Sequence, residues 1–233
     1  MNGLLKCLAL VLAFSGAAFA TDQPIESVRA SKDIALNTNP RSQFWQGARP
    51  VFLQLDVHGN PVPKYRTEVR TRWTDKYLYF LFICPYQELN LKPDPNTSVE
   101  TNQLWNWDVA EVFLGSDFQN IKRYKEFELS PQGEWIDLDI DLNKPHHEDG
   151  WVWNSGFKVS ARIDKKAHVW YGAMKIPYSA VDTKPAAAGN VLRANLFRSE
   201  GPESRHHEVT WHAPMSNTFH VPERFGLYKL VEK

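Results

Sequence analysis

Leu104-Trp-Asn-Trp-Asp-Val-Ala-Glu-Val-Phe-Leu-Gly-Ser116 is the stretch that decides the fold expected of this chain. It predicts a polar, aromatic-rich loop that leads into a strand. A turn should follow, and then a second strand within Tyr124-Lys-Glu-Phe-Glu-Leu-Ser-Pro-Gln-Gly133. The Pro-Gln-Gly at the end of this segment is a turn signal that ends the second strand. Side chains alternate along a strand, so one face of the first strand should carry Val109, Glu111 and Phe113 and the other should carry Ala110, Val112 and Leu114.

Glu111 therefore shares a strand face with apolar neighbours. A carboxylate in that position needs a partner, a ligand or water, because an unpaired buried charge is costly. Trp105 and Trp107 stand just upstream, at the mouth of whatever this face lines. Indole rings beside a carboxylate are typical of a sugar site, where rings stack on C–H faces and charged groups bind hydroxyls. A lone tryptophan is more often an ordinary core or rim residue, and the grouping of these two shifts the balance toward a site without settling it.

The first twenty residues predict a secretory signal peptide. Lys6 precedes an apolar run, and Ala18-Phe-Ala20 offers a small-residue cleavage site. Cleavage after Ala20 would leave residues 21–233 as the mature chain, secreted or periplasmic. The apolar run is too short for a membrane span. Cys84 would then be the only cysteine, which excludes an intrachain disulfide and leaves stability to the core.

The charge balance argues against nucleic acid and anionic membranes as partners. The chain has 27 basic and 27 acidic residues, with no long run of one sign. It is also rich in aromatic residues, with nine Trp, eight Tyr and thirteen Phe. In a secreted protein such a composition suits glycan recognition, and it suits a β-sandwich core equally well.

The rest of the chain predicts about ten short strands separated by turns, with almost no helical periodicity. A hairpin is expected over Glu68–Trp73 and Tyr77–Ile83, and its second arm is apolar on both faces, as in a central strand. Further strands are expected within 51–57, 157–163, 168–176, 191–198, 209–211 and 227–231. The predicted fold is all-β, an antiparallel β-sandwich that forms a single domain over residues 21–233.

Two segments contain clusters of residue types that can act as metal ligands. Asp137, Asp139 and Asp141 alternate with apolar residues and offer the oxygen ligands that calcium prefers. They lack the spacing of a helix-flanked calcium loop, so a solvated edge face is favoured. His146-His147-Glu148-Asp149 has no zinc-type spacing. The residues alone leave the metal content unknown.

Taken together, the segments resemble the family 9 carbohydrate-binding modules. The resemblance covers most of the mature chain and rests on several pieces in order: the Trp73…Tyr77-Leu-Tyr79 hairpin, Trp107-Asp-Val-Ala-Glu111-Val-Phe, Ile176-Pro177-Tyr, Pro185…Gly189, Asn195-Leu-Phe-Arg198, and Trp211…Phe219-His-Val-Pro-Glu-Arg-Phe225-Gly226. It implies an immunoglobulin-like β-sandwich that binds oligo- or polysaccharides between two aromatic rings. It also implies structural calcium and a role in polysaccharide catabolism alongside glycoside hydrolases.

The resemblance also implies site residues. Trp107 matches one ring of the clamp, Phe219 falls where the second aromatic stands, and Glu111 matches a carboxylate that bonds sugar hydroxyls. Two positions depart from the pattern. Phe219 offers a smaller face than the usual tryptophan, and Glu128 stands where sugar-binding members can place an arginine. The carbohydrate contacts expected from all these arguments are Trp107, Phe219, Glu111, Trp105, Glu128, Arg198 and His220. Pro85 stands near an expected acidic calcium ligand, which argues against that ion.

Two other functions remain open at this point. Glu111 and Glu128 on neighbouring strands could act as the carboxylate pair of a glycoside hydrolase. A haem carrier on the same sandwich would have to use Met174 or Met215 with a histidine, because the chain has no Cys-x-x-Cys-His. The identity of the sugar and the oligomeric state cannot be read from the sequence.

Overall fold

The computed structural model describes residues 23–144 and 153–233. Within these residues the chain forms twelve strands and a single turn of α-helix, α1 (Gln43–Gln46). The strands are β1 (Ile25–Arg29), β2 (Pro50–Leu53), β3 (Thr67–Trp73), β4 (Tyr77–Pro85), β5 (Val109–Gly115), β6 (Arg123–Leu129), β7 (Trp135–Asp141), β8 (Lys158–Asp164), β9 (Val169–Pro177), β10 (Val191–Glu200), β11 (His207–Thr210) and β12 (Gly226–Val231).

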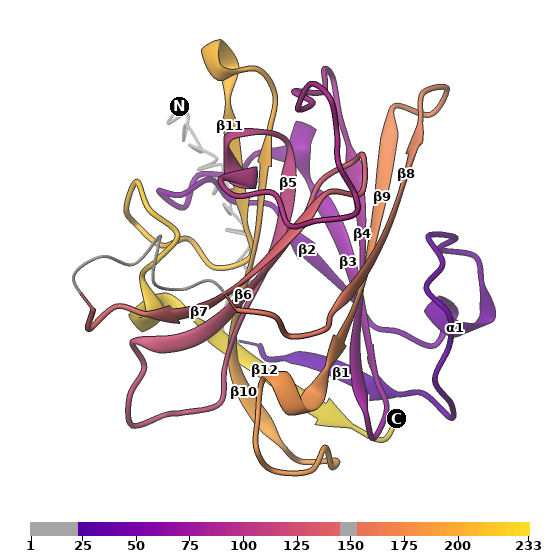
Figure 1. Cartoon of the computed structure of the whole chain (residues 1–233), viewed down its shortest axis with the longest axis vertical. Coiled ribbons are helices and arrows are strands. Elements are labelled where there is room, and N and C mark those ends of the chain that lie inside the picture. Colours follow the sequence, from indigo (N-terminus) through magenta and orange to yellow (C-terminus); the bar gives the residue numbers. More distant parts are fainter. Residues whose placement is uncertain (1–22, 145–152) are drawn as a thin grey trace, which may run out of the picture.

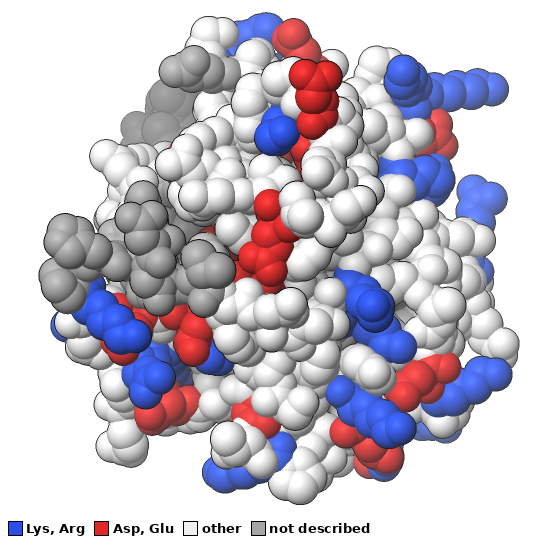
Figure 2. Space-filling model, viewed as in Figure 1, with Lys and Arg blue, Asp and Glu red and all other residues white. Residues whose placement is uncertain are grey.

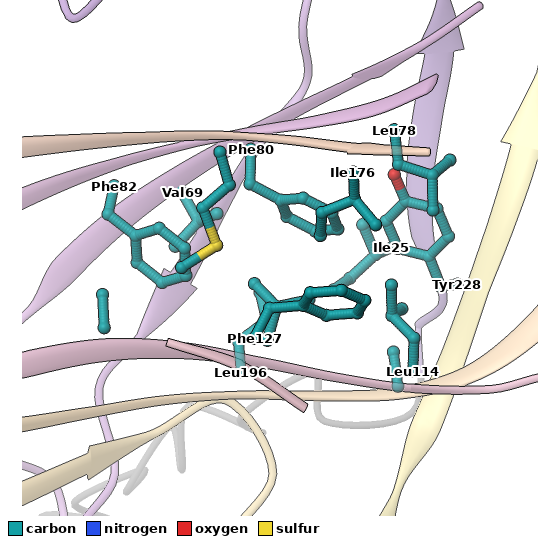
Figure 3. Close-up of a cluster of buried hydrophobic side chains, with 14 of the residues drawn as sticks. Ile25, Val69, Leu78, Phe80, Phe82, Leu114, Phe127, Ile176, Leu196 and Tyr228 are labelled. Atoms are coloured by element: carbon teal, nitrogen blue, oxygen red, sulfur yellow. The ribbon is translucent and has the colours of Figure 1, made fainter. Parts of the chain in front are cut away.

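The strands form a two-layer sandwich (Figure 1). They follow the order β7-β6-β5-β10-β12-β1-β3-β4-β9-β8, with β11 on β10 and β2 on β3. The sheet folds back on itself near β1, so that the β5, β6 and β10 layer faces the β3, β4 and β9 layer (Figure 3). This confirms the predicted all-β sandwich.

The main core lies between these two layers (Figure 3). Phe80 and Phe82 of β4 point toward Phe127 of β6 and Leu196 of β10, and all four side chains are fully buried. Burying a side chain of this size contributes roughly 1.5–3 kcal/mol. Cys84 is a free and buried cysteine, and no disulfide is present among the described residues. The two layers therefore pack against each other through apolar contacts.

The predicted hairpin and the predicted strand faces are confirmed. β3 and β4 pair antiparallel, and β4 lies between β3 and β9, which explains why it is apolar on both faces. In β5, Ala110, Val112 and Leu114 enter the main core. Val109 and Phe113 point the other way, into a second apolar cluster on the outer face of the β7-β6-β5-β10 layer.

Two expectations were wrong in detail. The sheet is mixed, because β1 pairs parallel with both β12 and β3, although the punctuated N-terminal segment gave no strand signal. The aspartate face of β7 is not fully solvated either: Asp137 is completely buried and accepts a hydrogen bond from the Ser155 backbone N–H at 2.6 Å. Alternation of apolar and acidic residues gives the periodicity of a strand, but it does not reveal which chain segment covers the acidic face.

Charges on the face shown in Figure 2 are of both signs, and neither sign forms a broad field there. None of the helices in the described ranges has the length and apolar composition that crossing a bilayer requires. The predicted signal peptide and the His146–Asp149 segment lie outside the described residues.

Candidate functional site

A pocket of about 460 Å³ opens on the outer face of the β7-β6-β5-β10 layer. Its floor comes from the outward-facing side chains of these strands. Its walls come from the 3-10 turn Leu104–Asn106, from the start of β11 and from the loop 217–220. The lining residues are Trp105, Glu111, Phe113, Glu126, Leu138, Leu142, Ser199, His206, Glu208, Asn217, Thr218, Phe219 and His220.

One side of the pocket is a layered stack of aromatic rings. Phe219 lies parallel to Phe197 of β10, with ring centroids 4.1 Å apart and an angle of 8° between the planes. Phe197 in turn meets Phe113 edge-on at 4.9 Å. The stack fixes the orientation of Phe219, since one of its faces is covered by Phe197. Trp105 packs against the same apolar cluster and is half-buried.

Three glutamates form the most unusual feature of the floor. Glu111 of β5 is directly opposite Glu128 of β6, and Glu126 lies two residues away on the same face. Carboxylate oxygens of all three lie within 4.8 Å of one another, and the residues are 0–3% exposed. Oε1 of Glu111, Oε2 of Glu126 and both oxygens of Glu128 accept no hydrogen bond from a described donor.

Burial and mutual repulsion dominate the electrostatics of this cluster. Burial, and then the neighbouring charges of Glu126 and Glu208, raise the pKa of Glu111 well above its usual range. Burial, and then Glu111 and Glu126, do the same to the pKa of Glu128. Both carboxyls therefore favour the protonated form unless a cation or a hydrogen-bond donor reaches them.

A tyrosine–histidine pair closes the other side of the floor. The Tyr124 hydroxyl and His220 Nδ1 are 2.6 Å apart, and His220 Nδ1 is 4.0 Å from Glu126 Oε2. The His220 ring also stacks on Phe113 at 5.5 Å. His220 thus has an aromatic support on one side and a carboxylate within reach on the other.

The structure brings four of the predicted contact residues to one pocket: Trp105, Glu111, Phe219 and His220. Glu128 belongs to the same glutamate cluster but lies behind the lining, fully buried. Trp107 is half-buried and is not among the described lining residues. The aromatic beside Glu111 at the mouth of the pocket is therefore Trp105.

Arg198 lies on the wrong face of β10 to reach the pocket. Its neighbours Phe197 and Ser199 point outward, whereas Arg198 points to the inner face and is fully buried. Its Nη1 donates to Thr67 Oγ1 at 3.0 Å, and its Nη2 lies 3.5 Å from Glu200 Oε2. This arrangement belongs to the packing of the sandwich.

Sequence reasoning missed three charged or titratable residues that line the pocket, namely Glu126, Glu208 and His206. Glu126 could have been found, because a period of two places it on the face of Glu128. Glu208 and His206 carried no such signal, since only the pairing of β11 with β10 brings them to the pocket.

Other chemistries find little support here. Cys84 is fully buried and burial raises its pKa to about 12, so its thiol is not an activated nucleophile. Met174 is fully buried in the core and is therefore unsuited to a haem in this pocket. Among the described residues, Glu111, Glu126 and Glu128 are the group whose oxygens suit a hard cation. The structural calcium expected from the resemblance stays a prediction.

A family model for carbohydrate family 9 binding domain-like proteins matches residues 41–233. The chain belongs to this family. The family 9 assignment made from the sequence is thus confirmed, and the match takes in every described strand from β2 to β12.

Solved structures share the fold of this chain. A family 9 carbohydrate-binding module from Caldicellulosiruptor kristjanssonii in complex with cellotriose superposes with a TM-score of 0.63 at 14% identity, over 91% of this chain and 95% of that chain. A family 9 module from the same organism in complex with glucose gives a TM-score of 0.64 at 14% identity, over 91% of this chain and 97% of that chain. These likenesses establish the fold.

The human protein UPF0462 protein C4orf33 is 26% identical over 114 residues, which are 48% of this chain and 50% of that protein. This family 9 chain thus spans about half the length of that curated relative.

Proposed function

We propose that this protein binds a saccharide in the pocket formed by Trp105, Glu111, Phe219 and His220. The observation that carries the proposal is the meeting of two aromatic side chains with buried, unsatisfied carboxylates in one cavity of about 460 Å³. The family assignment supports it, as do the cellotriose and glucose complexes of a module with the same fold.

The aromatic rings and the carboxylate acceptors would make different kinds of contact with the bound sugar. The pocket-facing side of Phe219 and the ring of Trp105 offer apolar surfaces for the C–H face of a pyranose, and burial of apolar surface contributes roughly 25 cal/mol per Å². Sugar hydroxyls supply the donors that Glu111 and Glu126 lack. A hydrogen bond to a charged acceptor contributes roughly 1.5–3 kcal/mol.

Trp105→Ala and Trp107→Ala form a matched pair that tests this proposal. Both residues are half-buried tryptophans two positions apart, but only Trp105 is among the described lining residues. Isothermal titration with glucose and cellotriose should show binding to the native protein and to Trp107→Ala, and binding at least tenfold weaker to Trp105→Ala. Equal losses in the two variants, or no binding of any glycan in a broad panel, would contradict the proposal.

The export signal and the partnership with glycoside hydrolases are part of the same proposal. Residues 1–20 carry the pattern of a cleaved signal peptide, and a secreted saccharide-binding chain has an evident use beside enzymes that release saccharides. N-terminal sequencing of the exported protein should begin at Thr21.

Reducing-sugar release by the purified protein, lost in Glu111→Gln, would show that the chain is itself a hydrolase rather than a partner of one.

A further inference from the structure

The described pocket lining is acidic, and its basic side chains are His206 and His220. Glu111, Glu126 and Glu208 are its acidic members, and none of its described residues is Lys or Arg. Glu128 adds a fourth carboxyl immediately behind the floor. The chain as a whole carries no net charge, so this concentration of carboxyl groups is local to the pocket and does not reflect an acidic protein.

The glutamates of the floor have few donors near them: Ser199 is the hydroxyl residue that the described strands contribute to the lining, and His220 Nδ1 lies 4.0 Å from Glu126 Oε2. Glu111 and Glu126 both line the pocket and are at least 97% buried, and Oε1 of Glu111 and Oε2 of Glu126 accept no hydrogen bond from a described donor. A buried acceptor without a donor is costly, because it has lost its hydrogen bonds to water. The site is therefore incomplete, and the group that completes it must bring donors and is favoured if it brings positive charge.

We infer that this pocket selects saccharides with a free, protonated amino group over neutral sugars, and that it rejects uronic acids. The inference rests on the saccharide-binding function proposed above and specifies its substrate class. An ammonium group offers three donors and a unit charge at one ring position. It thereby satisfies Glu111 and Glu126 together, whereas a hydroxyl supplies one donor and no charge.

The burial of the glutamate cluster strengthens the preference for a charged amino sugar over a neutral sugar. Charge–charge interactions in a partly enclosed, low-dielectric site are weakened less by solvent and salt than those at an exposed surface. An ionised uronate carboxylate brings neither a donor nor a positive charge, so it cannot complete the glutamate cluster, and it repels whichever of these glutamates is ionised. The aromatic rings contribute similarly to every pyranose and so set affinity without setting charge preference.

Four monosaccharides with the same ring isolate the charge. Isothermal titration of the full chain with glucosamine, N-acetylglucosamine, glucose and glucuronate, near pH 6 with EDTA present, should give glucosamine at least tenfold the affinity of glucose. N-acetylglucosamine, which keeps the nitrogen but loses the charge, should resemble glucose. Glucuronate should give no detectable binding.

The failures of the two ideas are distinguishable. Glucose binding as tight as glucosamine binding, or measurable glucuronate binding, would overturn the inference and leave saccharide binding intact. Absence of binding for all four sugars, and for their oligosaccharides, would overturn the proposed function itself. If Ca²⁺ restored glucose binding that EDTA had removed, the carboxylates would serve as metal ligands, and the inference would be wrong.

Glu126→Gln locates the effect within the protein. The change keeps the shape of the side chain and removes its charge, so the ratio of glucosamine to glucose affinity should fall at least fivefold. Glu232→Gln is the matched control, because it removes the same charge from an exposed residue that pairs with Arg29 and is absent from the pocket lining. An unchanged ratio in Glu126→Gln, or an equal fall in Glu232→Gln, would contradict the inference.

Discussion

Phe219 links the sandwich to the pocket. One of its faces lies flat on Phe197, a fully buried residue of β10, and its ring contributes to the pocket lining. The ring is therefore positioned before any ligand arrives, which lowers the entropic cost of binding. Its size, rather than its orientation, limits the area that a sugar ring can cover.

Substitutions of Phe219 should change affinity in both directions. Phe219→Ala removes the stacking surface, so affinity for glucose should fall roughly tenfold, equivalent to about 1.4 kcal/mol. Phe219→Trp enlarges the surface and should raise affinity by roughly two- to fivefold. Titration calorimetry measures both, with Phe118→Ala as control, since Phe118 is 47% exposed and does not line the pocket. Weaker binding to both Phe219 variants would mean that the ring has another role.

At the scale of elements, β5 and β6 carry the glutamate cluster. Their register places Glu111 directly opposite Glu128, and like charges in directly opposite positions destabilise a sheet. The Glu111–Glu128 pair is thus expected to lower the stability of the fold while it provides acceptors for a ligand. Groups of this kind are common at binding sites, where stability is exchanged for affinity.

Glu128→Gln should stabilise the protein, and the effect should depend on pH. Burial and the other glutamates raise the pKa of Glu128 in the folded state above its unfolded value near 4.5. Between the unfolded and the folded pKa values, the folded state binds more protons than the unfolded state. The free energy of unfolding of the native chain should therefore fall as pH rises from the unfolded pKa through the folded one. Urea unfolding near pH 8 should show Glu128→Gln more stable than the native chain by about 1–3 kcal/mol.

Near pH 4.5 that difference should shrink, because the native carboxyl is then protonated and resembles the amide. Glu232→Gln again provides the control, since its carboxylate is exposed. A Glu128→Gln chain less stable than the native chain at both pH values would show that the glutamate has a stabilising partner, such as a cation.

At the scale of the whole molecule, β1 joins the two halves of the sheet. It pairs parallel with β12 on one side and with β3 on the other. The Arg72 guanidinium secures this seam: its Nε donates to the Val28 carbonyl at 2.9 Å, Nη2 to the Arg29 carbonyl at 2.7 Å, and Nη1 to the Phe44 carbonyl at 2.8 Å.

Removing the Arg72 guanidinium should open the seam. Arg72→Leu keeps an apolar stem but leaves three carbonyls without their donor, so the free energy of unfolding in urea should fall by about 2–4 kcal/mol. Amide hydrogen exchange in β1 should rise by more than exchange in β4. Arg162→Leu on the outer strand β8 should change stability by less than about 1 kcal/mol, because its ion pair with Asp164 is exposed. Equal effects of the two substitutions would contradict the role of Arg72.

Much of the architecture could be predicted because strand periodicity is local. The faces of β5, the β3–β4 hairpin and the central place of β4 all follow from alternation and from turn residues. β1 could not be predicted, since its parallel partners are β12, at the far end of the chain, and β3, which follows α1 and β2, and a short segment carries no signal of them.

The sequence by itself determined the all-β sandwich and placed Glu111 beside aromatic side chains, because a two-residue repeat and a cluster of tryptophans are properties of neighbouring residues. Only the tertiary structure decided that Trp105 rather than Trp107 meets Phe219 at the pocket, and that Arg198 turns inward. The pocket combines a turn near residue 105, five strands and a loop near residue 219. Which side chains meet there depends on how distant segments pack, and local alternation holds no information about that.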